Sequence, residues 1–322
     1  MKLKHNLTST EWVTFTYIII TTIMIFAYWS GLNNPVGMLL LRGVVVGLIL
    51  LCVVCRSLPL LKTSPLGRLE GLLIALVGLL LMIWWYPENY DFCSQHPYQD
   101  HLFAALDQRL FGTQPSLQFS QALPQQLWSE LICMGYYSYY LVMAAVLLFC
   151  GLFRRDEFDE TCFIFFSSFF LFYFIYQFLP VAGPCFYFQA LIDQQLVTSD
   201  QLSTLTTFPA VGDYFRHHTD MMPLGMDGFF ASLVQSAHDI GERPTAAFPS
   251  SHVGMGMISM MLAWKSRNKI LFWSLMPFFI LLCMGTVYIR AHYLIDSIVG
   301  FFTAILFYLL TKWGYKKFRG QN

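Results

Sequence analysis

The sequence predicts an all-α, polytopic membrane protein, and three observations support this fold class. Hydrophobic residues make up 56% of the chain and charged residues only 12%, whereas soluble domains carry about 25% charged residues. The apolar residues gather in long runs, most of them near the ~20 residues that cross a bilayer as a helix. The formal net charge is zero. The chain therefore lacks the surplus of basic residues that would indicate a nucleic-acid partner.

Eight apolar runs predict about eight transmembrane helices. They cover residues 12–30, 36–55, 69–86, 128–153, 161–180, 249–264, 270–289 and 292–312. No small-residue cleavage site follows the first run, which we therefore interpret as a retained helix rather than a signal peptide. Two long loops, 87–127 and 181–248, interrupt the series, and the other connections are short.

The basic residues predict how the chain is oriented. Eight crossings would place both termini on one side of the membrane, together with fourteen Lys and Arg residues. The other side would hold Arg109, Arg216, Arg243 and Arg290, with Arg42 inside the second run near that end. The positive-inside rule then places the termini in the cytoplasm and both long loops on the outer face. The fourteen residues are Lys2, Lys4, Arg56, Lys62, Arg68, Arg154, Arg155, Lys265, Arg267, Lys269, Lys312, Lys316, Lys317 and Arg319.

The motif Pro249-Ser250-Ser251-His252 lies where the second long loop becomes the sixth apolar run, so we expect it to open a helix. Pro249 suits the first helical turn, where its missing N–H would have had no partner. Ser250 and Ser251 offer hydroxyl and backbone N–H groups at the positive end of the helix, where phosphate binds readily. A 16-residue run spans about 24 Å as a helix, less than the ~30 Å hydrocarbon core. The serines should therefore lie near the lipid phosphates, which favours a lipid substrate.

A second motif, from Arg290 to Asp296, opens the eighth run. His292 and Asp296 are four residues apart, so on a helix the carboxylate would orient and charge-stabilise the imidazole. His252 and His292 are separated by two crossings and should share the outer face. Arg243 and Arg290 lie close to the motifs, where a guanidinium could hold phosphate oxygens or serve as an ordinary loop residue. Two histidines and an aspartate at an anion site are the components of phosphoryl transfer through histidine.

These motifs resemble the second and third motifs of the type 2 phosphatidic acid phosphatase superfamily. Within it, the sequence is most similar to the inositolphosphotransferase branch that contains fungal inositol phosphorylceramide synthases. The tyrosine-rich stretch 136–140 and the stretch 178–184 support this resemblance, which covers roughly residues 100–305. It implies two parts: N-terminal transmembrane spans over residues 1–90 and a catalytic membrane domain over residues 91–322, with a six-helix-type phosphatase or phosphotransferase core.

The resemblance also implies a role for each residue of the catalytic set. His292 would be the nucleophile that accepts the phosphoryl group, and Asp296 would hold its tautomer and stabilise the imidazolium. His252 would act as general acid on the departing oxygen and then as base on the incoming acceptor. An intact set of this kind argues against an inactive scaffold.

The predicted phosphate site consists of Arg243, Ser250, Ser251 and Arg290. No metal or other cofactor is implied, because the arginines and the helix end supply positive charge. The sequence departs from the superfamily's motifs at Ser236, where a lysine is usual, and at Gly285 and Thr286, where Ser-Arg is usual.

The implied activity is the transfer of a phosphoryl or phosphorylated head group, such as inositol phosphate, through a phosphohistidine. The donor would be a phospholipid and the acceptor a ceramide-like or diacylglycerol-like lipid. A lipid phosphate phosphatase that releases inorganic phosphate is the alternative. A transporter fits less well, because the ionisable residues gather at one membrane face rather than at the midplane.

Other features of the long loops leave alternatives open. The segment 226–240 reads as an amphipathic helix on the outer leaflet, either a lid over the site or an anchor. Cys93 and Cys185 are expected on the oxidising side, where a disulfide could form. A cluster of polar residues could be a solvated loop, line the mouth of the site or bind a divalent metal. Its members are Arg216, His217, His218, Asp220 and His238.

Overall fold

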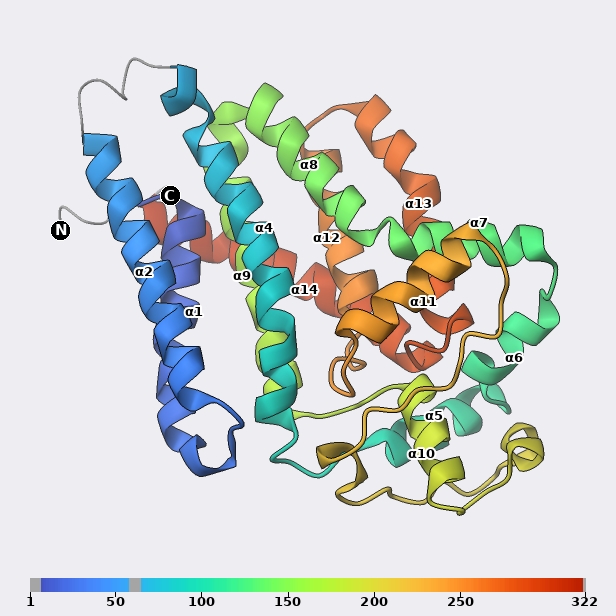
Figure 1. Cartoon of the computed structure of the whole chain (residues 1–322). Helices are drawn as coiled ribbons and strands as arrows, with labels where there is room; N and C mark the ends of the chain where they lie inside the picture. Colours follow the sequence, from blue (N-terminus) through green and yellow to red (C-terminus); the bar gives the residue numbers. More distant parts are fainter. Residues whose placement is uncertain (1–6, 58–64, 321–322) are drawn as a thin grey trace. The chain divides into compact units, whose positions relative to one another are not determined.

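The computed structural model describes residues 7–57 and 65–320 and is all-α in this part of the chain, which confirms the predicted fold class (Figure 1). Outside the helices, the described residues hold one isolated β-bridge, between Val181 and Ala246. The helices are α1 Ser9–Ala27, α2 Pro35–Ser57, α4 Pro65–Cys93, α5 Asp100–Phe111, α6 Pro115–Ala122, α7 Gln126–Tyr137, α8 Tyr139–Phe153, α9 Arg155–Phe178, α10 Pro184–Asp193, α11 Phe229–Gly241, α12 Ser251–Lys265, α13 Lys269–Tyr288 and α14 Leu294–Arg319, with short 3-10 turns at Trp29–Gly31, Ser199–Thr204 and Tyr214–Arg216.

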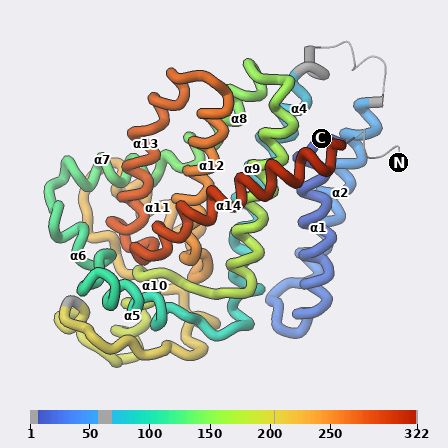
Figure 2. Tube along the Cα trace, turned by 180° about the vertical axis from the view of Figure 1, so that it is seen from behind, coloured from blue at the N-terminus to red at the C-terminus, as the bar shows by residue number. Residues whose placement is uncertain are grey.

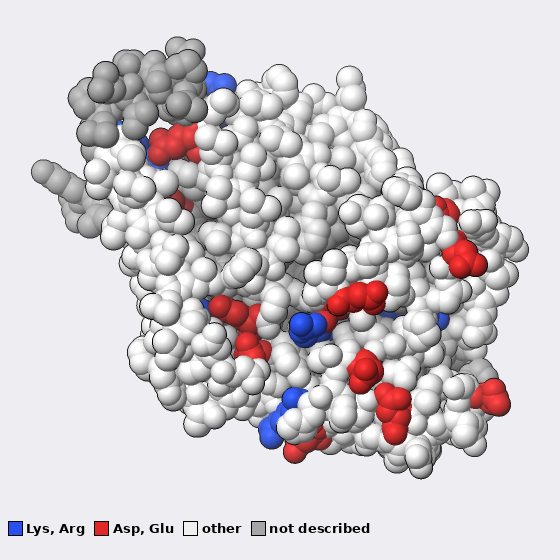
Figure 3. Space-filling model, viewed as in Figure 1, with Lys and Arg blue, Asp and Glu red and all other residues white. Residues whose placement is uncertain are grey.

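Every predicted apolar run is helical, but fewer than eight helices have the length of a membrane span. Six described helices are long and apolar enough to cross a membrane, or seven when the bent pair α7 and α8 is counted as one span. The fourth run breaks at Ser138, where the two helices meet at 46°. Helix α12 has 15 residues, which reach about 23 Å. The chain is a multi-pass membrane protein, and Figure 3 shows its charged side chains in a few patches on a largely uncharged surface.

The orientation of the chain in the membrane stays a prediction. Lys2, Lys4 and Lys62, which contribute to the predicted charge asymmetry, lie outside the described residues.

Residue contacts group the chain into two compact units, and α4, α8, α9 and α14 contribute residues to both. The first unit contains residues up to Trp85, Ala144–Phe170 and residues from Tyr308 onward, and the second contains Tyr86–Met143 and Leu171–Phe307. The predicted division at residue 90 stays a prediction about domains.

In the first unit, Asp159 joins three segments that are far apart in the sequence. Its carboxylate accepts hydrogen bonds from the backbone N–H of Ser9 at 2.8 Å, from the Tyr315 hydroxyl at 3.1 Å and from the Arg319 guanidinium at 2.8 Å. Helices α1 and α2 lie side by side in both views of the chain (Figures 1 and 2). This unit carries apolar helices and none of the predicted catalytic residues.

The second unit contains the two long loops, and much of their length is helical. The first loop forms α5 and α6, and the second forms α10 and α11. The predicted amphipathic helix at 226–240 is confirmed as α11, which packs against α7. Helices α12 and α13 form an antiparallel hairpin that brings the second motif back to the start of the first (Figure 2).

The disulfide considered between Cys93 and Cys185 is not formed. Both cysteines are buried and free. The Cys93 sulfur lies 3.0 Å from the Thr245 hydroxyl, and Cys185 lies in the first turn of α10. Both side chains pack in the apolar core beside the site.

Candidate active site

The first motif opens α12 through a serine cap. Ser250 is the N-cap, and its hydroxyl accepts the backbone N–H of Val253 at 3.4 Å. The sequence had suggested that Pro249 lies in the first helical turn. This was wrong, because Pro249 precedes the cap. The Ser250 backbone N–H donates to the carbonyl of Asp296 at 3.0 Å. Gly300 allows this approach, since a Cβ there would clash with the Ser250 backbone.

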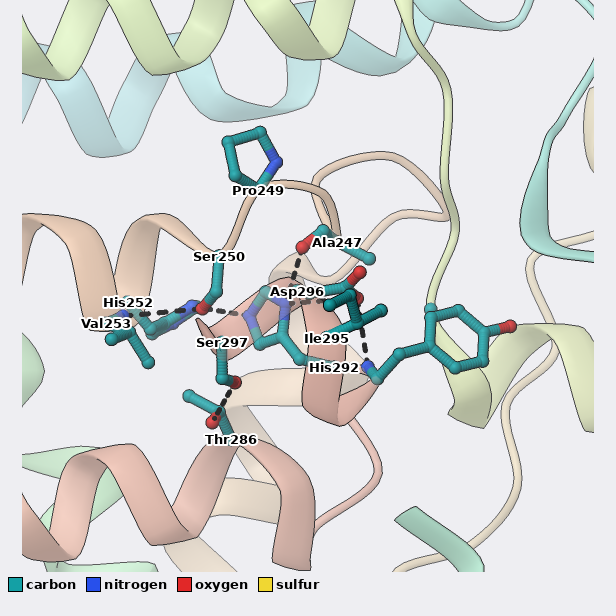
Figure 4. A network of polar contacts seen from close by, with 12 residues as sticks. Ala247, Pro249, Ser250, His252, Val253, Thr286, His292, Ile295, Asp296 and Ser297 are labelled. Carbon is teal, nitrogen blue, oxygen red and sulfur yellow. Dashed lines mark hydrogen bonds and ion pairs between the residues drawn. The ribbon is translucent and has the colours of Figure 1, made fainter. Parts of the chain in front are cut away.

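The second motif places His292 before α14 rather than on it, which corrects the expected shared helix face. The helix begins at Leu294. His292 Nδ1 lies 2.7 Å from the carbonyl oxygen of Ala247 and 4.0 Å from Asp296 Oδ2 (Figure 4). A carbonyl oxygen can only accept, so Nδ1 carries the hydrogen and Nε2 of the neutral ring has the free lone pair.

The Asp296 carboxylate is engaged with the backbone. As the third residue of α14, it accepts the N–H of Tyr293 at 2.9 Å, as the acidic residue of a capping box does. The tautomer of His292 is therefore set by Ala247, and the predicted hydrogen bond from Asp296 is not made. Asp296 is four residues from His292 and lies close enough to stabilise a positive charge on the ring.

The two histidines meet directly, although 40 residues separate them. His252 Nδ1 lies 3.2 Å from His292 Nε2 (Figure 4). Since His292 Nε2 is the acceptor in the tautomer set by Ala247, His252 Nδ1 is the donor. Burial lowers the pKa of His292 to about 4, so its ring is neutral at pH 7 with Nε2 unprotonated. An unprotonated imidazole nitrogen is the form that acts as a nucleophile.

The break between α7 and α8 brings two tyrosines against His252. The ring of Tyr136, in the last turn of α7, stacks on His252 at 4.7 Å, and the ring of Tyr139, in the first turn of α8, lies at 4.4 Å. The Tyr139 hydroxyl also donates to the carbonyl of Ser251 at 3.4 Å. The tyrosine-rich stretch 136–140 thus contributes to the site, chiefly by fixing the position of His252.

A narrow pocket opens at the two histidines. Its cavity volume is about 30 Å³, room for about two water-sized groups. Ser251 and Arg243, both predicted to bind phosphate, line it, whereas Ser250 is fully buried and does not line it. The lining residues are Tyr86, Ala182, Cys185, Phe186, His238, Glu242, Arg243, Ala246, Ala247, Ser251, His252, Ala291 and His292.

A family model described as the PAP2 superfamily matches residues 101–310, a range that contains both motifs. The chain belongs to the PAP2 superfamily. Membership supports an enzyme of the lipid phosphatase or phosphotransferase type. No curated protein and no solved structure matches the chain significantly.

One predicted phosphate ligand of this PAP2 protein, Arg290, is not among the residues that line the pocket. Arg290 has a positive φ of 64°, and its guanidinium donates to the carbonyl oxygens of Pro223 and Leu224. It thereby fixes the loop that leads into α11. A phosphate-binding role for Arg290 stays a prediction. Arg243 lines the pocket, and its Nη1 donates to the carbonyl of Glu242 at 2.8 Å.

Two buried acids on α5 hold the backbone around His292, and sequence reasoning assigned them no role. Asp107 accepts the N–H groups of Leu294 and Ile295 at 2.8 and 3.0 Å, so it caps α14 from another helix. Burial raises the pKa of Asp107 to about 6, against the opposing effect of the two N–H donors. The first of these two N–H groups belongs to Leu294, two residues after His292.

Asp100 holds the backbone of the segment that precedes α10. It accepts the N–H groups of Ala182 and Gly183 at 2.9 and 2.8 Å, and the Tyr293 hydroxyl at 3.2 Å. Burial raises the pKa of Asp100 to about 7. Asp100 and Asp107 are seven residues apart, so they share one face of α5, and this spacing is the signal by which both could have been found.

The acid Glu130 on α7 closes a third helix start. It accepts the N–H groups of Phe230 and Ala231 at 3.1 and 3.0 Å, which caps α11. Gly228, with a φ of 142°, lets the chain pass close to this carboxylate, because a Cβ at this position would overlap it. Helix α11 is thereby fixed at its start, and its other end reaches the pocket at His238.

The loop cluster considered as a metal site has other contacts. In the described ranges, no group of three or more His, Cys, Asp or Glu side chains is placed to hold a metal ion. Arg216 donates to the carbonyl of Ser94 at 2.8 Å, and the ring of His218 stacks on Tyr214 at 4.4 Å.

Proposed function

We propose that this PAP2 protein transfers a phosphorylated head group, such as inositol phosphate, between lipids through a phosphohistidine on His292. The observation that carries the proposal is the 3.2 Å contact between His292 Nε2 and His252 Nδ1, with the opposite nitrogen of His292 fixed by Ala247. A nucleophile held in its reactive tautomer beside a proton donor is what phosphoryl transfer through histidine requires.

In the first half-reaction, a phospholipid donor places its phosphorus at His292 Nε2. The Nε2–P bond forms while the bond from phosphorus to the glycerol oxygen breaks, and His252, in the imidazolium form that the bound phosphate favours, gives that oxygen a proton and becomes neutral. Diacylglycerol leaves, and the head-group phosphate stays on His292. The 3.2 Å contact leaves no space for a phosphoryl group between the two nitrogens, so substrate must part the rings.

In the second half-reaction, the hydroxyl of a ceramide-like or diacylglycerol-like acceptor attacks the phosphorus. The new P–O bond forms, the N–P bond breaks, and the hydroxyl proton passes to His252. Asp296, 4.0 Å from His292 Nδ1, stabilises the positive charge that the ring carries as phosphohistidine. Each residue then returns to its starting state.

The start of α12 supports phosphate binding without a metal. The first backbone N–H groups of a helix have no partner within it and lie at the positive end of the dipole. Ser251 and Arg243 line the same pocket and would hold the equatorial oxygens, with Ser250 as the cap behind them.

A lipid phosphate phosphatase, in which water attacks the phosphohistidine, is the second candidate. The narrow pocket favours it, because water fits there without help. The end of α11, which lines the pocket at His238, favours transfer, because oriented binding of an acceptor can offset the ~55 M of competing water through effective molarities of about 10⁵ M or more.

The deciding experiment supplies a labelled phospholipid donor to purified protein with and without an acceptor lipid. A transferase yields a new labelled lipid that depends on the acceptor and on His252. Label that appears only as inorganic phosphate or another water-soluble phosphate, whatever acceptor is offered, would establish the phosphatase instead.

We further propose that the termini are cytoplasmic and that the site faces the periplasm or an organelle lumen. The distribution of basic residues supports this orientation. In intact cells, Ile240→Cys should react with an impermeant thiol reagent above the wild-type background, and Lys269→Cys should not. Labelling of Lys269→Cys alone would reverse the assignment.

A further inference from the structure

The C-terminal end of α11 gives the pocket two polar side chains that phosphoryl transfer itself does not use. His238 lies in the last turn of the helix, and Glu242 follows it. Both line the pocket together with His252, His292 and Arg243. Arg243 has a clear use at a phosphate site, so the two neighbours need a separate explanation.

His238 is buried with an unused polar atom. Its side chain is 6% exposed, and within the described part of the chain its Nε2 has no hydrogen-bond partner. Burial lowers the pKa of His238, so the ring is uncharged at pH 7 and contributes little to anion binding. Its ring meets Tyr136 edge-on at 6.3 Å, and Tyr136 stacks on His252. A buried imidazole nitrogen without a partner costs free energy unless a ligand binds it.

Glu242 is the one acidic side chain among the described lining residues. The Tyr86 hydroxyl donates to its Oε2 at 2.9 Å, which fixes the carboxylate in the pocket. A carboxylate beside a phosphate is repelled by it, so a site built for phosphate alone would gain nothing from Glu242. Carboxylate oxygens do accept hydrogen bonds from uncharged hydroxyl groups, and an uncharged imidazole can donate or accept one.

We propose that His238 and Glu242 form a binding site for the hydroxyl end of an uncharged acceptor lipid, next to His252. This inference rests on the proposed transferase function and names how its second substrate is recognised. The cavity admits only a hydroxyl-sized group at the histidines, so the rest of the acceptor extends outward along α11. The attacking hydroxyl still gives its proton to His252; His238 and Glu242 hold the acceptor in place.

The test compares Glu242→Gln and His238→Ala with two matched controls on the same helix. Asp239→Asn removes an exposed carboxylate near Glu242, and Ser236→Ala removes an exposed polar group near His238. The donor is phosphatidylinositol with a fluorescent diacylglycerol moiety, and the acceptors are a short-chain ceramide and a short-chain diacylglycerol in detergent micelles. The burst of fluorescent diacylglycerol reports the first half-reaction, and product lipid that carries a tritium label from the inositol of the same donor reports the second.

Each site variant should raise the KM for acceptor about tenfold, which is the effect of losing one hydrogen bond of this kind. The burst and the KM for donor should stay within about twofold of wild type, and both controls should behave as wild type. Thermal unfolding of each variant checks that the fold is retained, and His238→Gln, which restores a hydrogen-bonding group, should recover part of the loss.

Each other outcome overturns a specific statement. If wild type transfers but both site variants keep their KM for acceptor, the acceptor site is wrong and the transferase stands. Equal changes in the burst and in the KM for acceptor would mean a structural or phosphate-binding role and would also overturn it. If wild type forms only water-soluble phosphate, the proposed function fails, and the acceptor site fails with it.

Discussion

Helices α12 and α14 begin beside each other at the site, yet their first turns are closed in different ways. The start of α12 is capped by its own Ser250, a neutral group. The start of α14 is capped by the carboxylate of Asp107, which takes two N–H groups from another helix. Glu130 closes α11 in the same manner. A carboxylate satisfies the positive end of the helix dipole, so of these three starts only that of α12 is left for an external anion.

The two kinds of cap have different consequences. A carboxylate cap holds the start of a helix in place, whereas the neutral cap of Ser250 leaves the start of α12 able to bind an anion. Asp107 fixes the first turn of α14, and with it His292, the proposed nucleophile, two residues earlier. The segment that precedes α12 fixes the tautomer of His292 through the Ala247 carbonyl. His252 stands in the open first turn of α12, where a phosphate would arrive. The proposed nucleophile, His292, thus belongs to a helix start closed by a carboxylate, and the proposed acid–base group, His252, to one that is open to an anion.

The largest effect expected in the site comes from the two histidines. His292→Ala and His252→Ala should each lower the rate of turnover by more than 10³-fold, because removal of a member of such a set commonly has effects of this size. Expression and the unfolding temperature should change little, since both residues serve chemistry. Turnover by purified protein checks this, and either variant retaining more than a tenth of the wild-type rate would refute the assignment.

A carboxylate introduced at the start of α12 should prevent phosphate from binding there. Ser250→Asp keeps a good N-cap, but its charge would compete with phosphate at the start of α12, and we expect about a 100-fold loss of turnover. Ser250→Asn is the matched control, since it has the same size and capping ability without the charge. The comparison is turnover by the two variants at equal unfolding temperature; equal activity would mean that phosphate does not bind at this helix start.

Removal of the carboxylate from the closed start should act mainly on stability. Asp107→Ala leaves two half-buried N–H groups without an acceptor, which costs about 1–3 kcal/mol of unfolding free energy, and turnover should fall about tenfold as His292 loses its support. Asp107→Asn keeps one acceptor and should be milder in both. Denaturant unfolding and turnover test this; a variant with normal stability but no turnover would show that Asp107 takes part in the chemistry instead.

The sequence predicted the helices and the meeting of the two motifs better than it predicted the contacts around them. Apolar runs predict helices because the pattern is local, and the motifs are family patterns that place His252 and His292 together. The caps from Asp107 and Glu130 join a side chain to backbone about 100 to 190 residues away. Such pairs leave no local pattern beyond the shared face of Asp100 and Asp107.

Asp296 shows why spacing predicted the neighbour correctly but not the contact: Asp296 lies 4.0 Å from His292 and makes its hydrogen bond to the backbone instead. A separation of four residues predicts contact with His292 only if both lie on the helix, and α14 begins at Leu294. At the third helical position, Asp296 bonds back to the N–H of Tyr293, a local bond that competes with the imidazole. The sequence also gave no sign of the break between α7 and α8 at Ser138, because the apolar run 128–153 continues through it.

The smallest effect expected is that of a chelator. If the open start of α12 and Arg243 hold the phosphate, the positive charge that stabilises the transition state comes from the chain itself. Excess EDTA should then leave the rate of head-group transfer or phosphate release unchanged, while Arg243→Gln should lower it by weakening the hold on the equatorial oxygens. Arg290→Gln tests the other predicted phosphate ligand and should lower the rate less, because Arg290 does not line the pocket and its guanidinium binds the carbonyls of Pro223 and Leu224. Activity that disappears with chelator and returns with added magnesium or zinc would show that a metal supplies the charge, and the contrast between an open α12 and a closed α14 would then lose its role in phosphate binding.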